Sequence, residues 1–143
     1  MGRDERGQSI IELALTLPML VFVMVGGADL ARAYALQLAV QNGARAGAEA
    51  AAIDFTPTST EAIARARDEM ARTPGMDANL ATVTATFKQA DGVTACIDPP
   101  TVATPCYATV RVLYTFRTVT PWPLIPNVAN FDRSTSMRMI RGQ

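Results

Sequence analysis

An acidic side chain within an otherwise apolar run is the feature of this sequence most open to chemistry. After Glu12 there is no further charge until Asp29. Counted from Gln8, the run is about 20 residues long, which is the length that an α-helix needs to cross a hydrocarbon core of about 30 Å. A carboxylate costs on the order of 2.5–3.5 kcal/mol at the centre of a bilayer and less near its edge, so we expect Glu12 to have a partner.

A cut of the chain after Gly7 would supply that partner. The cut would make Gln8 the first residue and give it an α-ammonium group, whose pKa of about 8 keeps it largely charged. This group would lie one helical turn from Glu12 and could also reach the acid of a neighbouring subunit. The pairing offsets the cost of the buried carboxylate and specifies the register between subunits.

Three interpretations of the N-terminal segment compete. A cleaved secretory signal has a shorter apolar run, of about 7–15 residues, and its only plausible cut here lies within Val25–Ala28. A plain signal anchor explains the length of the run but not Glu12. The third interpretation is a prepilin-type signal, whose pattern is a short charged leader, a glycine, four residues, a glutamate and then a long apolar helix.

The segment from Arg6 to Tyr34 resembles the TadE-like family, the small pilin-like subunits of tight-adherence (Tad) pilus systems. The residues that carry the resemblance are Arg6-Gly7-Gln8-Ser9, Glu12, Leu17-Pro18, Gly26-Gly27, and Asp29 followed by Arg32. Leu13 departs from the family, in which an aromatic residue often follows the acid. The resemblance implies that a prepilin peptidase cuts the chain between Gly7 and Gln8, and that the product joins other pilin-like subunits and the pilus assembly machinery.

The composition argues against most other functions. The net charge is zero, which gives no indication of nucleic-acid binding. The sequence has no His and only two Cys, too few for a structural zinc site or for a His-based catalytic triad. We find no nucleophile–base pair, phosphate-binding loop or carboxylate cluster. We therefore expect no enzyme activity, no metal or other cofactor, and no small-molecule substrate.

The apolar run continues into a longer helix. Pro18 removes one backbone hydrogen bond and should kink or loosen the helix, which membrane helices tolerate. Beyond Asp29 the sequence is rich in Ala, and Leu30, Tyr34 and Leu38 recur at helical spacing. We predict one helix from about Ser9 to about Ile53, roughly 65–70 Å long. The pair Gly43 and Gly47 would allow another element to approach closely, most simply the sheet, which would pack locally on these small residues.

The rest of the chain predicts a small α+β head. Thr58-Ser59-Thr60-Glu61 resembles a capping box, and it opens a short helix that reaches about Arg72. Period-two alternation then predicts four strands. Short connections favour an antiparallel sheet, which the Ala-rich helix covers on one face in a pilin-like arrangement. The predicted strands span 80–89, 93–97, 107–119 and 135–140.

Cys96 and Cys106 flank a loop that contains three prolines. They are either a disulfide or two free thiols. We favour the disulfide, because a membrane anchor places the head in an oxidising compartment. Closing a loop of about ten residues would contribute about 2–3 kcal/mol in the chain-entropy model.

A second proline-rich stretch, residues 120–127, carries the only Trp. Two interpretations remain open. The stretch is either a loop that packs back on the head, or a contact loop for a neighbouring subunit or the membrane surface, since Trp is common in both settings. The candidate contact residues are Trp122, Leu124 and Ile125.

We therefore divide the chain into a leader (1–7), a transmembrane helix (8–28), its extracytoplasmic continuation (29–54) and the head (55–143). Arg3 and Arg6 favour a cytoplasmic N-terminus and an extracytoplasmic head, on a single-pass protein of the bacterial cytoplasmic membrane. The function that fits is a minor subunit or assembly protein of a Tad or type IV-like pilus. The alternative is an unprocessed single-span protein whose head binds a partner.

Overall fold

The computed structural model of the protein describes residues 5–54, 57–96, 101–123 and 125–139. In chain order its elements are α1 (Glu5–Ile53), α2 (Ser59–Ala71), the 3-10 helix η1 (Ala78–Leu80), β1 (Thr82–Gln89), β2 (Cys106–Arg117) and β3 (Val128–Arg138). A long N-terminal helix, a short second helix and an antiparallel sheet confirm the predicted α+β fold class.

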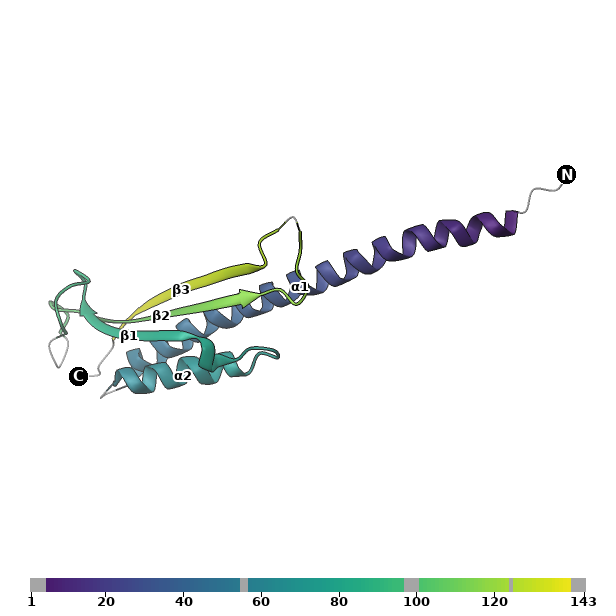
Figure 1. Cartoon of the computed structure of the whole chain (residues 1–143). Helices are drawn as coiled ribbons and strands as arrows, with labels where there is room; N and C mark the ends of the chain where they lie inside the picture. Colours follow the sequence, from purple (N-terminus) through teal and green to yellow (C-terminus); the bar gives the residue numbers. More distant parts are fainter. Residues whose placement is uncertain (1–4, 55–56, 97–100, 124, 140–143) are drawn as a thin grey trace.

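The head covers only part of α1. In Figure 1 the sheet and α2 lie along the second half of the helix, and the first half extends away from them. The predicted end of α1 at Ile53 is confirmed, and the helix begins four residues before the predicted Ser9. It also continues through Pro18, which therefore does not end it.

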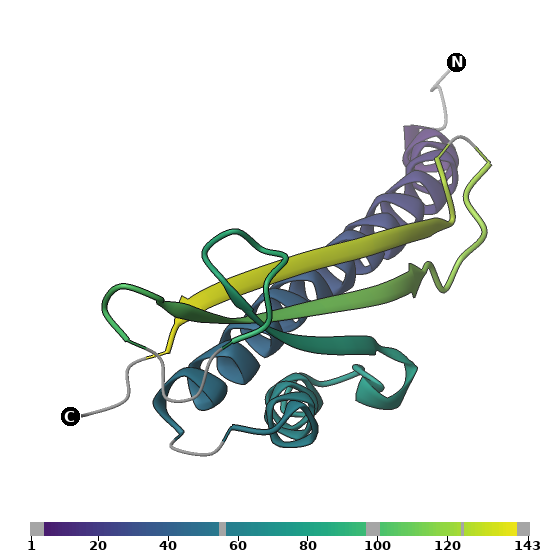
Figure 2. The ribbon, with the colours of Figure 1, turned by 90° about the vertical axis from the view of Figure 1, so that its left-hand side faces the viewer.

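Small side chains line the face of α1 that packs on the head. Figure 2 shows α1 and α2 on the same side of the sheet. The buried positions of α1 recur at spacings of three and four, as one face of a helix requires. They include Leu36, Val40, Ala44, Ala48 and Ala51.

The larger apolar side chains in the same part of α1 lie outside the core. Leu30 and Tyr34 are largely exposed, and Leu38 is partly exposed. The periodicity of these three residues correctly predicts a helix. The face that packs on the head is the neighbouring one, which consists mainly of alanines.

Gly43 and Gly47 allow α2 to lie close against α1. A Cβ built on Gly47 would be 2.7 Å from the backbone oxygen of Ala62 and 3.2 Å from Val110. A Cβ on Gly43 would be 2.5 Å from Cγ of Met70. The predicted close approach at this pair is present, but the main neighbour is α2 rather than the predicted sheet, of which only Val110 comes near.

The start of α2 agrees with the predicted cap. Thr58 is the N-cap residue, and its Oγ1 accepts a hydrogen bond from the backbone N–H of Glu61. The hydroxyl in turn donates to the Glu61 carboxylate at 2.7 Å. The helix buries Ala62, Ala66 and Met70 against α1 and the sheet.

The sheet is antiparallel in the order β1-β2-β3. Alternate residues of β2 are buried from Cys106 to Phe116, as the period of two predicts. Val110, at the centre, pairs with Ala85 of β1 and Thr135 of β3. One face of the sheet thus contributes to the core, and the other is open.

Two of the predicted strands need correction. β3 begins at Val128, seven residues before the predicted Thr135, because its first half lacks the apolar alternation that marks a half-buried strand. The predicted strand at 93–97 is wrong over its described residues, where the structure shows only one isolated bridge, between Ala95 and Lys88.

Candidate functional site

The first half of α1 presents an apolar surface that the rest of the chain leaves largely uncovered. All residues from 7 to 25 are exposed. Among the described residues, α1 is the one helix long and apolar enough to cross a membrane. An apolar surface of this extent marks a site of contact with lipid or with other apolar helices.

Gln8 and Glu12 lie one turn apart on this surface. Nε2 of Gln8 donates a hydrogen bond to Oε1 of Glu12 at 3.4 Å. Thr16, one further turn along, donates to the backbone oxygen of Glu12 at 2.8 Å. Gly7 lies within the helix, and a Cβ built on it would meet nothing within 4 Å. The structure therefore brings the predicted partners, Gln8 and Glu12, together on one face.

Asp29 forms a second polar centre, at the end of the apolar run. It is the one buried charged residue among the described residues, with 6% of its surface exposed. Its Oδ1 accepts hydrogen bonds from the backbone N–H of Val119 at 3.1 Å and from Arg32 at 3.0 Å. Its Oδ2 accepts from the backbone N–H of Thr120 at 3.3 Å and from the indole N–H of Trp122 at 3.2 Å.

Four donors therefore surround one carboxylate, and three of them belong to the connection between β2 and β3. We call this connection the Trp122 loop (residues 118–123 and 125–127), and we call its hydrogen bonds to Asp29 the Asp29 clasp. The Val119 N–H is the largest cause that lowers the pKa of Asp29 below its usual value, burial opposes it, and the other three donors add to the lowering.

Asn127 closes the Trp122 loop upon itself. Its side-chain oxygen accepts from the backbone N–H of Trp122 at 2.6 Å, and its Nδ2 donates to the Trp122 carbonyl at 3.1 Å. Its backbone oxygen accepts from the N–H of Thr118 at 3.1 Å. These bonds fix the loop conformation that presents three donors to Asp29.

The indole ring of Trp122 lies on α1 within the apolar run. It meets the ring of Phe22 edge to face, with 4.6 Å between centroids. A Cβ built on Gly26 would be 3.2 Å from the indole, so the absence of a side chain there gives the ring its place. Gly27, the next residue, has nothing within 4 Å of the same position.

The three predicted contact residues of the loop therefore differ in their surroundings. Trp122 is buried on its own chain, and the interpretation in which it packs back is the one that the structure favours, with α1 as its surface. Ile125 is 57% exposed. Leu124 lies outside the described residues. The sequence points to Asp29 only through the family resemblance, because no local spacing connects it with Trp122, more than ninety positions later.

The predicted disulfide is present, between Cys96 and Cys106, with 5.6 Å between the two Cα atoms. It joins the start of β2 to the segment that precedes it. In Figure 1 this connection lies at the end of the sheet that is farther from the N-terminus.

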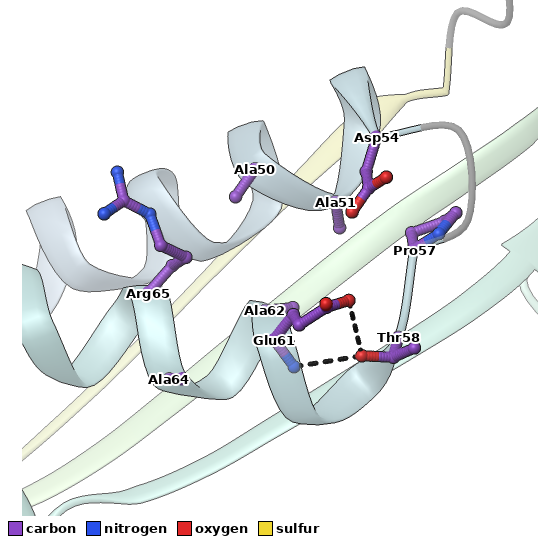
Figure 3. A pocket seen from close by; sticks show the side chains of 9 residues that line it. All are labelled: Ala50, Ala51, Asp54, Pro57, Thr58, Glu61, Ala62, Ala64 and Arg65. Atoms are coloured by element: carbon purple, nitrogen blue, oxygen red, sulfur yellow. Dashed lines mark hydrogen bonds between the residues drawn. The ribbon is translucent and has the colours of Figure 1, made fainter.

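A pocket of about 310 Å³ lies where α1 gives way to α2. Figure 3 shows that Ala50, Ala51 and Ala62 line it, and that Thr58 and Glu61 are hydrogen-bonded to each other at its edge. Because these two polar groups already cap α2, we assign this pocket to the packing of the two helices.

Residues 7–49 match the family model described as TadE-like protein. The match confirms the resemblance that the sequence indicated. It contains Gln8, Glu12 and Asp29, and it ends within α1, so that α2 and the sheet lie beyond it. No curated protein and no solved structure matches the chain.

Proposed function

We propose that this chain, which resembles TadE-like proteins over residues 7–49, is a minor subunit or assembly protein of a bacterial Tad or type IV-like pilus. In this proposal a prepilin peptidase cuts the chain after Gly7, and the apolar half of α1 then assembles with other pilin-like subunits. The role is structural, and no catalytic residue is assigned.

The exposed apolar half of α1, with one acid near its start, is the observation that carries the proposal. A helix that leaves large side chains such as Ile10, Phe22 and Met24 exposed needs lipid or like helices around it. A subunit that is first held in the cytoplasmic membrane has lipid around this helix, and the same subunit has like helices around it once it enters a bundle. The head would then face outward, with the N-terminus on the cytoplasmic side.

The position of Gln8 supports the predicted pairing. The side chain of Gln8 already reaches Glu12 across one turn. After a cut at Gly7, the new α-ammonium would lie on the same turn of the helix. It could then pair with Glu12 of its own chain or of a neighbour and set the register of the helices. Pro18, two turns further, would give the helix local flexibility during its extraction from the membrane.

The mature N-terminus tests this function. We expect intact-mass analysis and N-terminal sequencing of membrane-extracted protein to show Gln8 as the first residue, in cells with an active prepilin peptidase. We expect Gly7→Leu to abolish the cut, since a large side chain then stands at the scissile position. Gly27→Leu is the matched control, because Gly27 is also an open helical glycine. A wild-type chain that still begins at Met1 would contradict the proposal and favour the unprocessed alternative.

Glu12→Ala separates assembly from processing. We expect the cut to be largely unchanged, whereas the amount of subunit recovered in sheared pili, or in cross-linked complexes with other pilins, falls at least about tenfold. The reason is that one charge of a buried pair left alone costs about 3–5 kcal/mol. Thr16→Ala, which removes an uncharged group one turn away, is the control. Normal assembly of Glu12→Ala would disprove the pairing.

A further inference from the structure

The Trp122 loop is set in a long uncharged stretch. No charged residue occurs between Arg117 and Asp132. Two apolar side chains of the loop remain open to the surroundings, Val119 at 74% and Ile125 at 57% exposed. Exposed apolar side chains in an uncharged loop mark a site of contact with an apolar partner.

The loop lies beside the apolar run of α1. The Asp29 clasp holds one side of it, and the indole ring of Trp122 extends from Asp29 over Gly26 to the ring of Phe22. At 1.5 Å per residue, Gly26 lies about 5 Å along the helix from Asp29 in the direction of the N-terminus. If residues 8–28 span the bilayer, the ring of Trp122 lies at the depth of the outer part of the acyl chains, and its N–H points to Asp29 at the boundary.

The backbone of the loop is also suited to a water-poor setting. The N–H groups of Thr118, Val119, Thr120 and Trp122 all donate hydrogen bonds, to Asn127 or Asp29. Pro121 and Pro123 have no N–H. From residue 118 to 123, therefore, no backbone donor is left to pair with water, and this removes the donor part of the cost of placing irregular backbone near lipid.

We propose that the Trp122 loop is a second membrane contact, which lies in the interface of the outer leaflet beside the spanning helix. Val119 and Ile125 would face lipid, and the buried ring of Trp122 would hold the loop against α1 at that depth. This position suits an indole, whose N–H seeks a polar partner while its ring is apolar. The inference depends on the proposed membrane anchoring of α1. Lipid is favoured over a second protein copy because the loop lies level with the end of the spanning segment.

Trp122 is the only Trp, so its fluorescence reports on the loop directly. The full chain is reconstituted in phosphatidylcholine vesicles at high dilution in lipid and is purified by flotation. We expect lipid brominated near the headgroup end of its acyl chains to quench the emission at least about twofold, and more strongly than lipid brominated near the methyl end. Gly26→Leu, which removes the place of the ring, should change this quenching, whereas Gly27→Leu should not.

A second probe does not depend on the buried ring. Ile125→Cys is labelled with a polarity-sensitive fluorophore under non-reducing conditions, which leave the Cys96–Cys106 disulfide intact. We expect its emission to shift to the blue and rise several-fold on reconstitution, as an apolar environment requires. Val93→Cys is the control and should keep the emission of a label in water, because Val93 is 75% exposed and lies beside Lys88, where β1 pairs with the start of β2, at the other end of the sheet.

The outcomes separate this inference from the function on which it depends. Flotation with quenching of Trp122 and a blue shift at position 125 supports both. Flotation without either signal overturns the membrane contact and leaves the anchoring in place. A blue shift at position 125 that needs high protein density and disappears on dilution in lipid would assign the loop to a second copy, which also overturns the inference. Failure to float overturns both.

Discussion

Asp29→Ala is expected to release the Trp122 loop from α1. The substitution removes both acceptor oxygens at once and leaves the N–H groups of Val119 and Thr120 and the indole N–H without their partner. Donors left unpaired away from water are costly, so the loop should open. We expect the amides of Val119 and Thr120 to exchange hydrogen at least about tenfold faster, and the emission of Trp122 to shift to the red.

The control for this change is Asp68→Ala. It removes the same charge from an exposed position on α2, and it should leave the exchange of the loop unaltered. The amides of the loop in Asp29→Asn should exchange at a rate between those of Asp29→Ala and Asp68→Ala. The Asn side chain keeps one acceptor oxygen but turns a donor toward groups that also donate. Unchanged exchange in Asp29→Ala would show that the loop is held by the apolar contact with Phe22 alone.

The same clasp predicts a dependence on pH. The pKa of Asp29 is lowered in the folded chain, chiefly by the N–H of Val119. A lowered pKa means that the contribution of Asp29 is fully present above its unfolded value, near 3.8, and is lost as the pH falls through the folded value. Acid should therefore speed amide exchange in the loop beyond the intrinsic effect of pH, and Asp29→Asn should not show this excess.

Gly47→Ala is expected to destabilise the contact between α1 and α2. The new Cβ would lie 2.7 Å from the backbone oxygen of Ala62 and 3.1 Å from the Cβ of Ala66, neither of which can rotate away. Overpacking of a core costs about 1–3 kcal/mol, and the better helix propensity of Ala returns about 1 kcal/mol. We expect a lower free energy of unfolding for the full chain in detergent, measured by urea titration, and a larger loss for Gly47→Leu.

Gly27→Ala is the matched control, since the same change at an open position of the same helix gains propensity and meets no neighbour. Gly43→Ala should also destabilise this contact, since its Cβ would lie 2.5 Å from Cγ of the buried Met70 and 3.0 Å from the backbone oxygen of Ala66. Equal stability of Gly47→Ala and Gly27→Ala would show that α2 is free to move outward, and that close packing there is not required.

Local sequence rules predict the elements of this fold well where the pattern is periodic. The apolar alternation in β2 and the Thr58 cap of α2 needed only neighbouring residues, and both agree with the structure. The first half of β3 was missed because its exposed and partly buried positions carry mainly polar residues such as Asn130 and Asp132. It is formed by pairing with β2 rather than by a pattern of its own.

The candidate site was predicted in part for a similar reason. Gln8 and Glu12 are four residues apart, a spacing that any helix brings together. The partners of Asp29 come from the far end of the sheet, so no local spacing indicates them. Only the topology, which returns the chain from β2 to the side of α1, places Trp122 next to Phe22 and Asp29.

The unbroken course of α1 from Glu5 to Ile53 has a mechanical consequence. Because one continuous helix forms both the apolar segment and the support of the sheet, and the Asp29 clasp adds a second attachment, the head is held in one orientation about the helix axis. Any rotation of the apolar segment about its own axis turns the open face of the sheet through the same angle. In a bundle, the side of α1 that contacts neighbouring helices would therefore also determine the direction in which the open face of the sheet points.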